Sequence, residues 1–120
     1  MIARGTAPSV SSKKAALDRI RAICFAMPEV EEKISHGAPS FHVRGKMLVM
    51  FLDDHHGDGR LALWLAAPDG MQQALVEAAP EHYFRPPYVG HRGWLGVRLD
   101  RGLDLEVVKE HLDTALATVS

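Results

Sequence analysis

Short apolar segments separated by turn-forming residues dominate the middle of this chain and most constrain its fold. Four segments follow one another: EEKISH (31–36), PSFHV (39–43), KMLVMFL (46–52) and RLALWLAA (60–67). The residues between them, Arg44-Gly45 and the longer DDHHGDG, are typical of turns. Consecutive strands with short connections pair with their neighbours, so this region predicts an antiparallel meander.

Further along the chain, the segment WLGVRLD (94–100) alternates between apolar and other residues and predicts a fifth strand. Apolar residues at three- and four-residue spacing predict three helices: one before Pro28, one between Pro68 and Pro80, and one capped by Asp104. The last helix is expected to bury Leu105, Val108, Leu112, Leu116 and Val119.

Three helices and about five antiparallel strands predict an α+β fold, a two-layer sandwich in which the helices cover one face of the sheet. A length of 120 residues is typical of one domain. We expect residues 1–11 to form a flexible tail and residues 12–120 a single domain, with Ser11 or Ser12 capping the first helix.

The second face of the predicted sheet is also apolar. Alternation in the fourth segment places Ala62, Trp64 and Ala66 on this side, and the third segment is apolar on both sides. Such a face is too apolar to be simply solvated, so a dimer partner, a ligand or a loop is expected to cover it.

Composition limits the classes of function. The formal net charge of −1 gives no strongly basic field, so any binding to nucleic acid must come from a local patch. Cys24 is the only cysteine, which excludes an intrachain disulfide and a cysteine-based zinc site. With no segment typical of a signal peptide or a membrane span, the sequence predicts a cytoplasmic protein without a membrane partner.

Three stretches of the chain together resemble one known family: ISHGAPSFHVRGKMLVMFLDD, RLALWLAAP and YFRPPYVGHRGWLGVRLD. Their specific parts are SHGxPSF (35–41), the pair Lys46-Met47 and YVGHRGW (88–94). The chain thereby resembles the MmcQ/YjbR family of small bacterial proteins from about residue 17 to residue 116. The resemblance implies a compact α+β fold. Members are commonly labelled DNA-binding, with β-hairpins as paired wings, and some relatives carry enzyme-like labels; the family implies no catalytic residue.

The segment RPPYVGHRGW suits a non-catalytic DNA-binding module, because it combines positive charge with rings that can stack on bases. The predicted site has phosphate contacts from Arg44, Lys46, Arg85, Arg92 and Arg98, charge from His91, and stacking or packing by Tyr88 and Trp94. In a purely structural interpretation, the prolines and glycines stiffen and bend a loop whose aromatic residues cap the core.

Two other functions fit the same residues. The first is a pocket for a small anionic metabolite, which the protein binds or even turns over, between the sheet and the YVGHRGW loop. Its polar groups would be His36, Tyr88, His91 and Arg92, and its walls Trp64 and Trp94. The second is a homodimerising adaptor that uses the apolar second face.

Neither a metal, a cofactor nor a catalytic residue is predicted. The carboxylates and imidazoles of DDHHGDG are of the right types for a metal, but Asp and Gly are the expected turn formers there, which favours a solvated turn. His36, His42 and His91 would suit either a three-histidine metal site or structural hydrogen bonds to the backbone. Known nucleophile, phosphate-loop and zinc-protease motifs are absent from the sequence.

Overall fold

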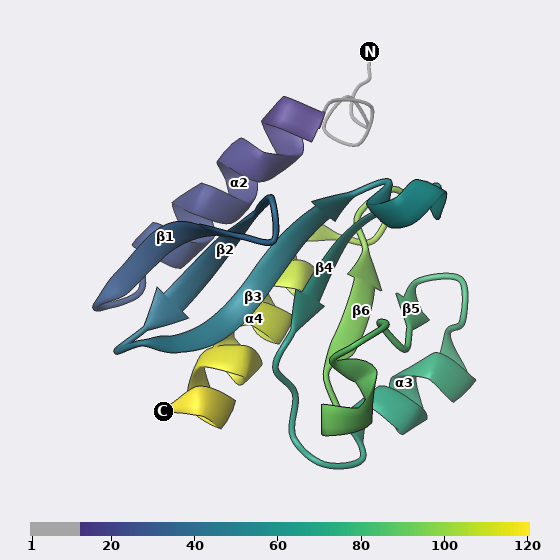
Figure 1. Ribbon diagram of the computed structural model, residues 1–120. Helices are drawn as coiled ribbons and strands as arrows, with labels where there is room; N and C mark the ends of the chain where they lie inside the picture. Colours follow the sequence, from purple (N-terminus) through teal and green to yellow (C-terminus); the bar gives the residue numbers. More distant parts are fainter. Residues whose placement is uncertain (1–12) are drawn as a thin grey trace.

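A computed structural model describes residues 13–120, in which one six-stranded sheet is flanked by three helices (Figure 1). The strands are β1 (Val30–Ser35), β2 (Ala38–Val43), β3 (Lys46–Asp53), β4 (Leu61–Leu65), β5 (Tyr83–Phe84) and β6 (Leu95–Arg98). The helices are α2 (Lys13–Phe25), α3 (Met71–Ala78) and α4 (Leu105–Val119), with single 3-10 turns η2 (His55–Gly57) and η3 (Gly90–Arg92). The predicted α+β class is confirmed, whereas the predicted tail and the serine caps lie outside the described residues.

The strands lie in the order β1-β2-β3-β4-β6-β5, and every neighbouring pair is antiparallel. The first four strands form the predicted meander. Its turns His36-Gly37 and Arg44-Gly45 have positive φ at both positions, as two-residue hairpin turns require. The sheet has six strands rather than about five, because Tyr83 and Phe84, for which no strand was predicted, pair with β6.

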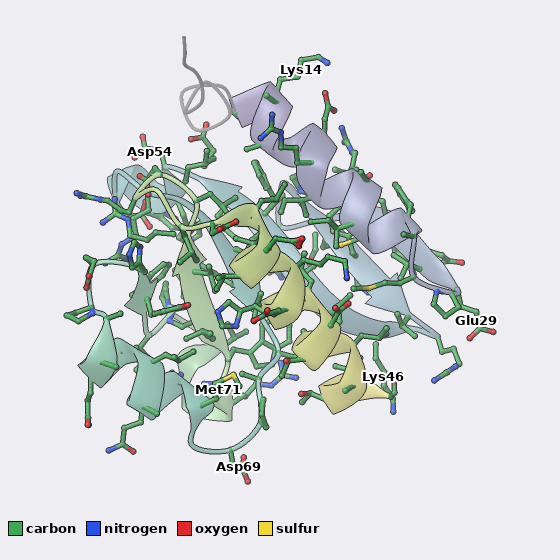
Figure 2. All side chains as sticks on the ribbon, turned by 180° about the vertical axis from the view of Figure 1, so that it is seen from behind. Lys14, Glu29, Lys46, Asp54, Asp69 and Met71 are labelled. Carbon is green, nitrogen blue, oxygen red and sulfur yellow. The ribbon has the colours of Figure 1, made fainter. Side chains whose placement is uncertain are left out.

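One face of the sheet, here called the helix face, packs against α2 and α4. Figure 2, seen from behind, shows α4 crossing the sheet with α2 beside it, and α4 contacts β3 and β4. The helix α3 lies at the other end of the sheet, where it contacts β5 and β6. The largest fully buried side chains of the helix face include Phe41, Phe51, Leu63, Leu65, Leu95 and Val97.

Helix α4 begins as predicted, since the Asp104 side chain accepts a hydrogen bond of 3.0 Å from the backbone N–H of Glu106. The predicted burial of Leu105 is wrong: this first residue of the helix is 42% exposed. The buried stripe begins one turn later, at Val108, and includes His111 and Ala115.

The helix face also satisfies its buried polar side chains. Tyr83 of β5 and His111 of α4 form a hydrogen bond of 2.8 Å between the phenol oxygen and Nε2. Burial lowers the pKa of His111 and raises the pKa of Tyr83, which keeps both groups neutral near pH 7. This face is therefore a closed core with a paired polar contact inside it.

The opposite face, here called the open face, carries the alternate residues of the same strands. Met50 pairs with Trp64, and Trp64 pairs with Gly96, so the indole lies at the centre of this face. The ring of Phe84 covers Gly96 so closely that a Cβ there would lie 2.5 Å from it. Within residues 13–120, the central part of this face is not covered by a helix. Two irregular segments, η2 and the loop 85–94, lie beside it.

Candidate functional site

The open face holds a pocket of about 540 Å³, within the range of small-molecule binding sites. We call it the open-face pocket. Its lining residues are His36, Met47, Met50, Leu52, His55, His56, Trp64, Tyr88, Val89 and Arg92. They come from strands β3 and β4, from the β1–β2 turn, from η2 and from the loop 85–94. The pocket is thus assembled from segments far apart in the sequence.

The base of the pocket is apolar and comes from the sheet. Met50 and Leu52 are two residues apart on β3, so both side chains point to the same face. Trp64, opposite Met50 on β4, is only 2% exposed. Methionine side chains adapt their shape to what they contact, so this base can accommodate an apolar body of variable shape.

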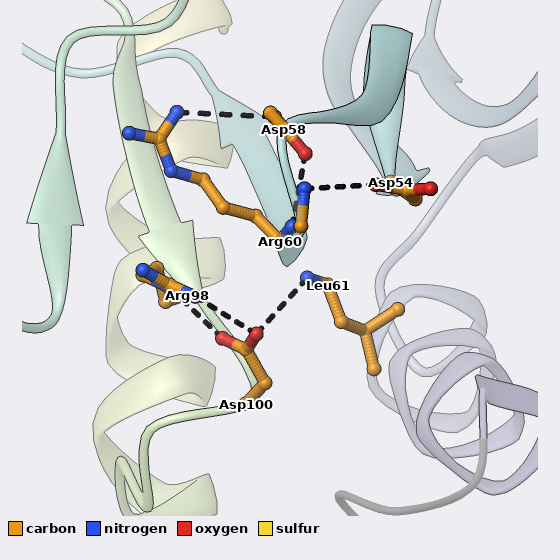
Figure 3. A network of polar contacts seen from close by, with 7 residues as sticks. Asp54, Asp58, Arg60, Leu61, Arg98 and Asp100 are labelled. Atoms are coloured by element: carbon orange, nitrogen blue, oxygen red, sulfur yellow. Dashed lines mark hydrogen bonds and ion pairs between the residues drawn. The ribbon is translucent and has the colours of Figure 1, made fainter.

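One wall of the pocket is η2, which the sequence DDHHGDG forms between β3 and β4. The Asp54 carboxylate accepts from the N–H of Gly59 at 2.8 Å, and Asp58 accepts from the N–H of Arg60 at 2.9 Å. Asp100 accepts from the N–H of Leu61 at 3.4 Å, which ties the start of β4 to the end of β6 (Figure 3). The carboxylates of this segment therefore hold the backbone of the turn.

This arrangement changes the interpretation of the two neighbouring histidines. The segment is solvated as expected except at His55, which is partly buried and whose ring packs edge-on against Trp64, with centroids 4.8 Å apart. His56, at a φ of 50°, also lines the pocket. Sequence reasoning missed both residues, because alternation identifies strand faces but does not tell which way a turn folds over the sheet.

The opposite wall is the loop 85–94. Tyr88 adopts a φ of 68°, in the left-handed region that side chains other than glycine rarely occupy, and it is 70% exposed. Its ring lies 5.9 Å from that of His55 and 6.5 Å from that of Trp64. The loop is fixed to α3 by Gln72, whose side-chain amide donates to the carbonyls of Gly90 and Trp94 at 2.9 Å and 2.6 Å.

The charge of the open-face pocket is one-sided. Its described lining includes one arginine and three histidines and no Asp or Glu. Burial, and secondarily the neighbouring His56, lowers the pKa of His55, so this imidazole is neutral near pH 7. The guanidinium of Arg92 lies over the ring of Trp94, 5.4 Å from its centroid, and supplies the permanent positive charge of the site.

Four of the residues predicted for a ligand pocket line it together: His36, Trp64, Tyr88 and Arg92. The other two do not belong to its lining. His91 is exposed on η3, and Trp94 is 5% exposed and packed in the core cluster. The ring of Trp94 therefore packs against other residues rather than standing open for stacking.

The cations predicted to contact DNA are spread over the molecule. Arg44 pairs with Glu29 at 2.7 Å at the β2–β3 turn, beside the exposed Lys46. Arg98 makes two hydrogen bonds of 3.0 Å to Asp100 (Figure 3). Arg98 pairs with Ala62, which pairs with Leu52, so Arg98 lies level with Leu52 but two strands away from it. Leu52 is itself roughly 20 Å from Lys46 along β3, at about 3.3 Å per residue.

Arg85 lies at the start of the loop 85–94. Its side chain crosses Gly90, where a Cβ would lie 2.6 Å from Cγ of Arg85, so a residue without a side chain is needed there. Its guanidinium is outside the open-face pocket.

The three histidines considered for a metal are not brought together. His42 is hydrogen-bonded to Ser40 Oγ at 3.0 Å, whereas His36 lines the pocket and His91 lies on η3. Residues 13–120 contain no cluster of three His, Cys, Asp or Glu side chains arranged to hold a metal ion.

Burial raises the pKa of the Cys24 thiol to about 12, so it is not an activated nucleophile. Within the same range, a helix able to cross a membrane is not found.

The architecture defines a class: a single antiparallel sheet with helices on one face and a ligand-sized pocket on the other. The family model described as YjbR matches residues 25–117. The chain therefore belongs to the YjbR family, as the motifs in its sequence predicted.

The fold has a solved relative. The crystal structure of the Deinococcus radiodurans protein DR2400, with the domain DUF419, superposes with a TM-score of 0.73 and 22% sequence identity. The match covers 86% of this chain and 77% of that one, and at this identity it establishes the fold alone. No curated protein matches the sequence.

Proposed function

We propose that this protein binds a small organic anion in the open-face pocket. The observation that carries the proposal is the pairing of an apolar base, formed by Met50, Leu52 and Trp64, with a described lining that contains one arginine and three histidines but no acidic side chain. An apolar base favours a ligand with a hydrophobic body, and a one-sided charge favours an anionic group on it. The proposed role is that of a binding module, without a catalytic step.

Conformation supports the choice of this site. His36, His56 and Tyr88 all have positive φ and all line the pocket. For His36 a hairpin turn explains the conformation, but His56 and Tyr88 lie in longer connections, where such backbone costs free energy. Unfavourable backbone conformations cluster at binding sites, where the surrounding contacts maintain them.

The test is isothermal titration calorimetry with four anions: decanoate, 4-phenylbutyrate, phenyl phosphate and inorganic phosphate. We expect binding of one or more of the anions with an apolar body and none of inorganic phosphate. Arg92→Gln should weaken that binding by about tenfold or more, as expected for a hydrogen-bonded charge. Arg85→Gln is the matched control, because Arg85 is on the same loop but outside the pocket.

Two results would contradict the proposal. One is the absence of binding by all four anions. The other is an equal loss of affinity in the two arginine variants, which would assign the effect to the overall charge of the loop rather than to the pocket.

DNA binding is the second hypothesis, favoured by the exposed hairpin end that carries Arg44 and Lys46. It ranks below ligand binding because Arg44 and Arg98 already have carboxylate partners and because the cations are far apart. The test is fluorescence anisotropy of labelled DNA across a salt series. If DNA binds there, Lys46→Ala should reduce the slope of log affinity against log salt by about one. An unchanged slope would exclude this contact.

Homodimerisation through the open face is a third hypothesis, and light scattering tests it. A dimer mass that falls to the monomer mass with Tyr88→Glu would support it, since Tyr88 is the exposed aromatic residue of that face. A monomer mass for the unmodified protein would contradict it.

A further inference from the structure

Two ring nitrogens of the open-face pocket are buried without a hydrogen-bond partner among the described residues: Trp64 Nε1 and His55 Nε2. One further buried side-chain atom shares this property, His82 Nδ1, which lies before β5 and outside the pocket. Buried polar atoms are nearly always paired in folded proteins. Two such exceptions in one ligand-sized pocket call for a physical explanation.

The two nitrogens belong to neighbouring rings. The rings of Trp64 and His55 meet edge to face, with centroids 4.8 Å apart and planes at 76°. The Trp64 side chain is fixed in place, because it is 2% exposed and lies on β4, which pairs with β3 on one side and with β6 on the other. The indole N–H is therefore a fixed donor, and the ring of His55 lies beside the indole ring.

The chemistry of these groups specifies what they need. An indole nitrogen only donates, so its partner must be an acceptor. A neutral imidazole carries one N–H, and when that proton is on Nε2 it donates as well. A carboxylate has two oxygens that accept hydrogen bonds and no donor of its own, so it satisfies both nitrogens at once.

We infer that the ligand of this pocket is an apolar monocarboxylate whose carboxylate accepts hydrogen bonds from Trp64 Nε1 and His55 Nε2, with its body over Met47 and Met50. This inference rests on the proposed function and names the chemical class of the ligand. The charge of Arg92 stabilises the carboxylate from the wall of the same pocket.

Access to the two nitrogens requires a small movement, since both are shielded from solvent. His55 is part of η2, between Asp54 and His56 with φ of 54° and 50°. Tyr88, which lies beside His55, is 70% exposed, so its ring has room to turn outward. Tyr88 neighbours both rings, so an outward turn of its side chain opens that side of His55 and Trp64 to the incoming carboxylate while the two rings stay together.

The direct test is a titration followed by ¹H–¹⁵N spectra of the indole groups. The sequence contains two tryptophans, so two indole cross-peaks are expected, and Trp94 serves as the internal control because it does not line the pocket. On addition of decanoate or 4-phenylbutyrate, the Trp64 peak should move downfield and saturate, while the Trp94 peak stays in place. Phenyl phosphate and inorganic phosphate are the comparison anions.

Variants measure the contribution of each donor. Trp64→Phe keeps an aromatic ring and removes the N–H, and should lower the affinity for decanoate by about tenfold or more. Trp94→Phe is the matched control: it keeps an aromatic ring beside Arg92 and removes an N–H outside the pocket, so the affinity should stay close to that of the unmodified protein. If Trp64→Phe does not fold, His55→Phe and the cross-peak shift in the unmodified protein provide the same test.

The outcomes separate this inference from the proposed function. Carboxylate binding without a shift of the Trp64 peak, or with full affinity in Trp64→Phe, overturns the inference and leaves the proposed function standing. Binding of phenyl phosphate but of neither carboxylate would likewise overturn the inference and leave the proposed function standing. If none of the four anions binds, both are wrong.

Discussion

The helix face and the open face are built from alternate residues of the same strands, yet they differ in whether their buried polar atoms have hydrogen-bond partners. On the helix face, Leu63 packs under the helices and the polar pair Tyr83–His111 is closed by a hydrogen bond. On the open face, Trp64 is as buried as Leu63, but its polar atom has no partner among the described residues and a pocket lies beside it.

The comparison shows how one sheet can separate stability from binding. Burial of apolar area and complete pairing of polar atoms stabilise the folded state. A surface that binds a ligand leaves some polar atoms without a hydrogen bond in the unbound state, and the ligand supplies the missing partners. We expect substitutions on the helix face to change the free energy of unfolding, and substitutions on the open face to change binding.

The largest effect is expected for Leu63→Ala. Leu63 is fully buried between the sheet and the helices, so the variant should lose about 2–5 kcal/mol of stability through lost burial and the cavity left behind. Urea denaturation measures this loss. A loss below about 1 kcal/mol, closer to the effect of a surface substitution, would show that the helix face is not the main core.

Tyr83→Phe should have the next largest effect. It removes the phenol hydroxyl and leaves the buried Nε2 of His111 without its partner, at a cost of about 1–3 kcal/mol. Phe84→Leu, a change of apolar size in the adjacent residue, is the control for packing in β5. Denaturation of the two variants should differ in pH dependence, because only the first involves a titrating partner.

The pH dependence of stability has a definite sign. Burial lowers the pKa of His111 in the folded protein, so below the unfolded value of about 6.5 the unfolded chain binds a proton that the folded chain does not. Stability should be full above that pH and fall as the pH decreases, by at most about 1.4 kcal/mol per pH unit for this group. Denaturation curves recorded from about one pH unit above to about one pH unit below that unfolded value test it. His111→Gln should flatten the curve; an equal slope in that variant would assign the effect to other groups.

The smallest effect on stability is expected for Trp64→Phe. The substitution removes an N–H that has no partner among the described residues, and the indole borders a pocket, so the loss should stay below about 1 kcal/mol. A loss equal to that of Leu63→Ala would mean that the open face contributes to the core as much as the helix face does.

Much of the fold could be predicted from the sequence, because its signals are local. Alternation in residues 60–67 identified the two sides of β4, and Asp104 marked the start of α4. The strand β5 was missed because it is two residues long and exists only through its pairing with β6. The exposure of Leu105 was missed because spacing along a helix does not tell where the helix first meets the sheet.

The candidate site was predictable only in part. His36, Trp64, Tyr88 and Arg92 lie together in the pocket, although their binding role stays a prediction. The contribution of His55 depends on how η2 folds back over the sheet, which its turn-forming composition does not reveal. The ion pair that occupies Arg98 depends on the path of the chain after β6.

The central claim is that the open face, and not the helix face, receives a ligand. Methyl ¹H–¹³C spectra recorded during a titration with 4-phenylbutyrate test it most directly, because both faces carry methyl groups. We predict shifts for Met47, Met50, Leu52 and Val89, which line the pocket, and none for Leu48, Leu63 and Val97 in the core. Saturating shifts confined to the core methyls, or no shift on either face with this ligand, with decanoate and with phenyl phosphate, would contradict the claim.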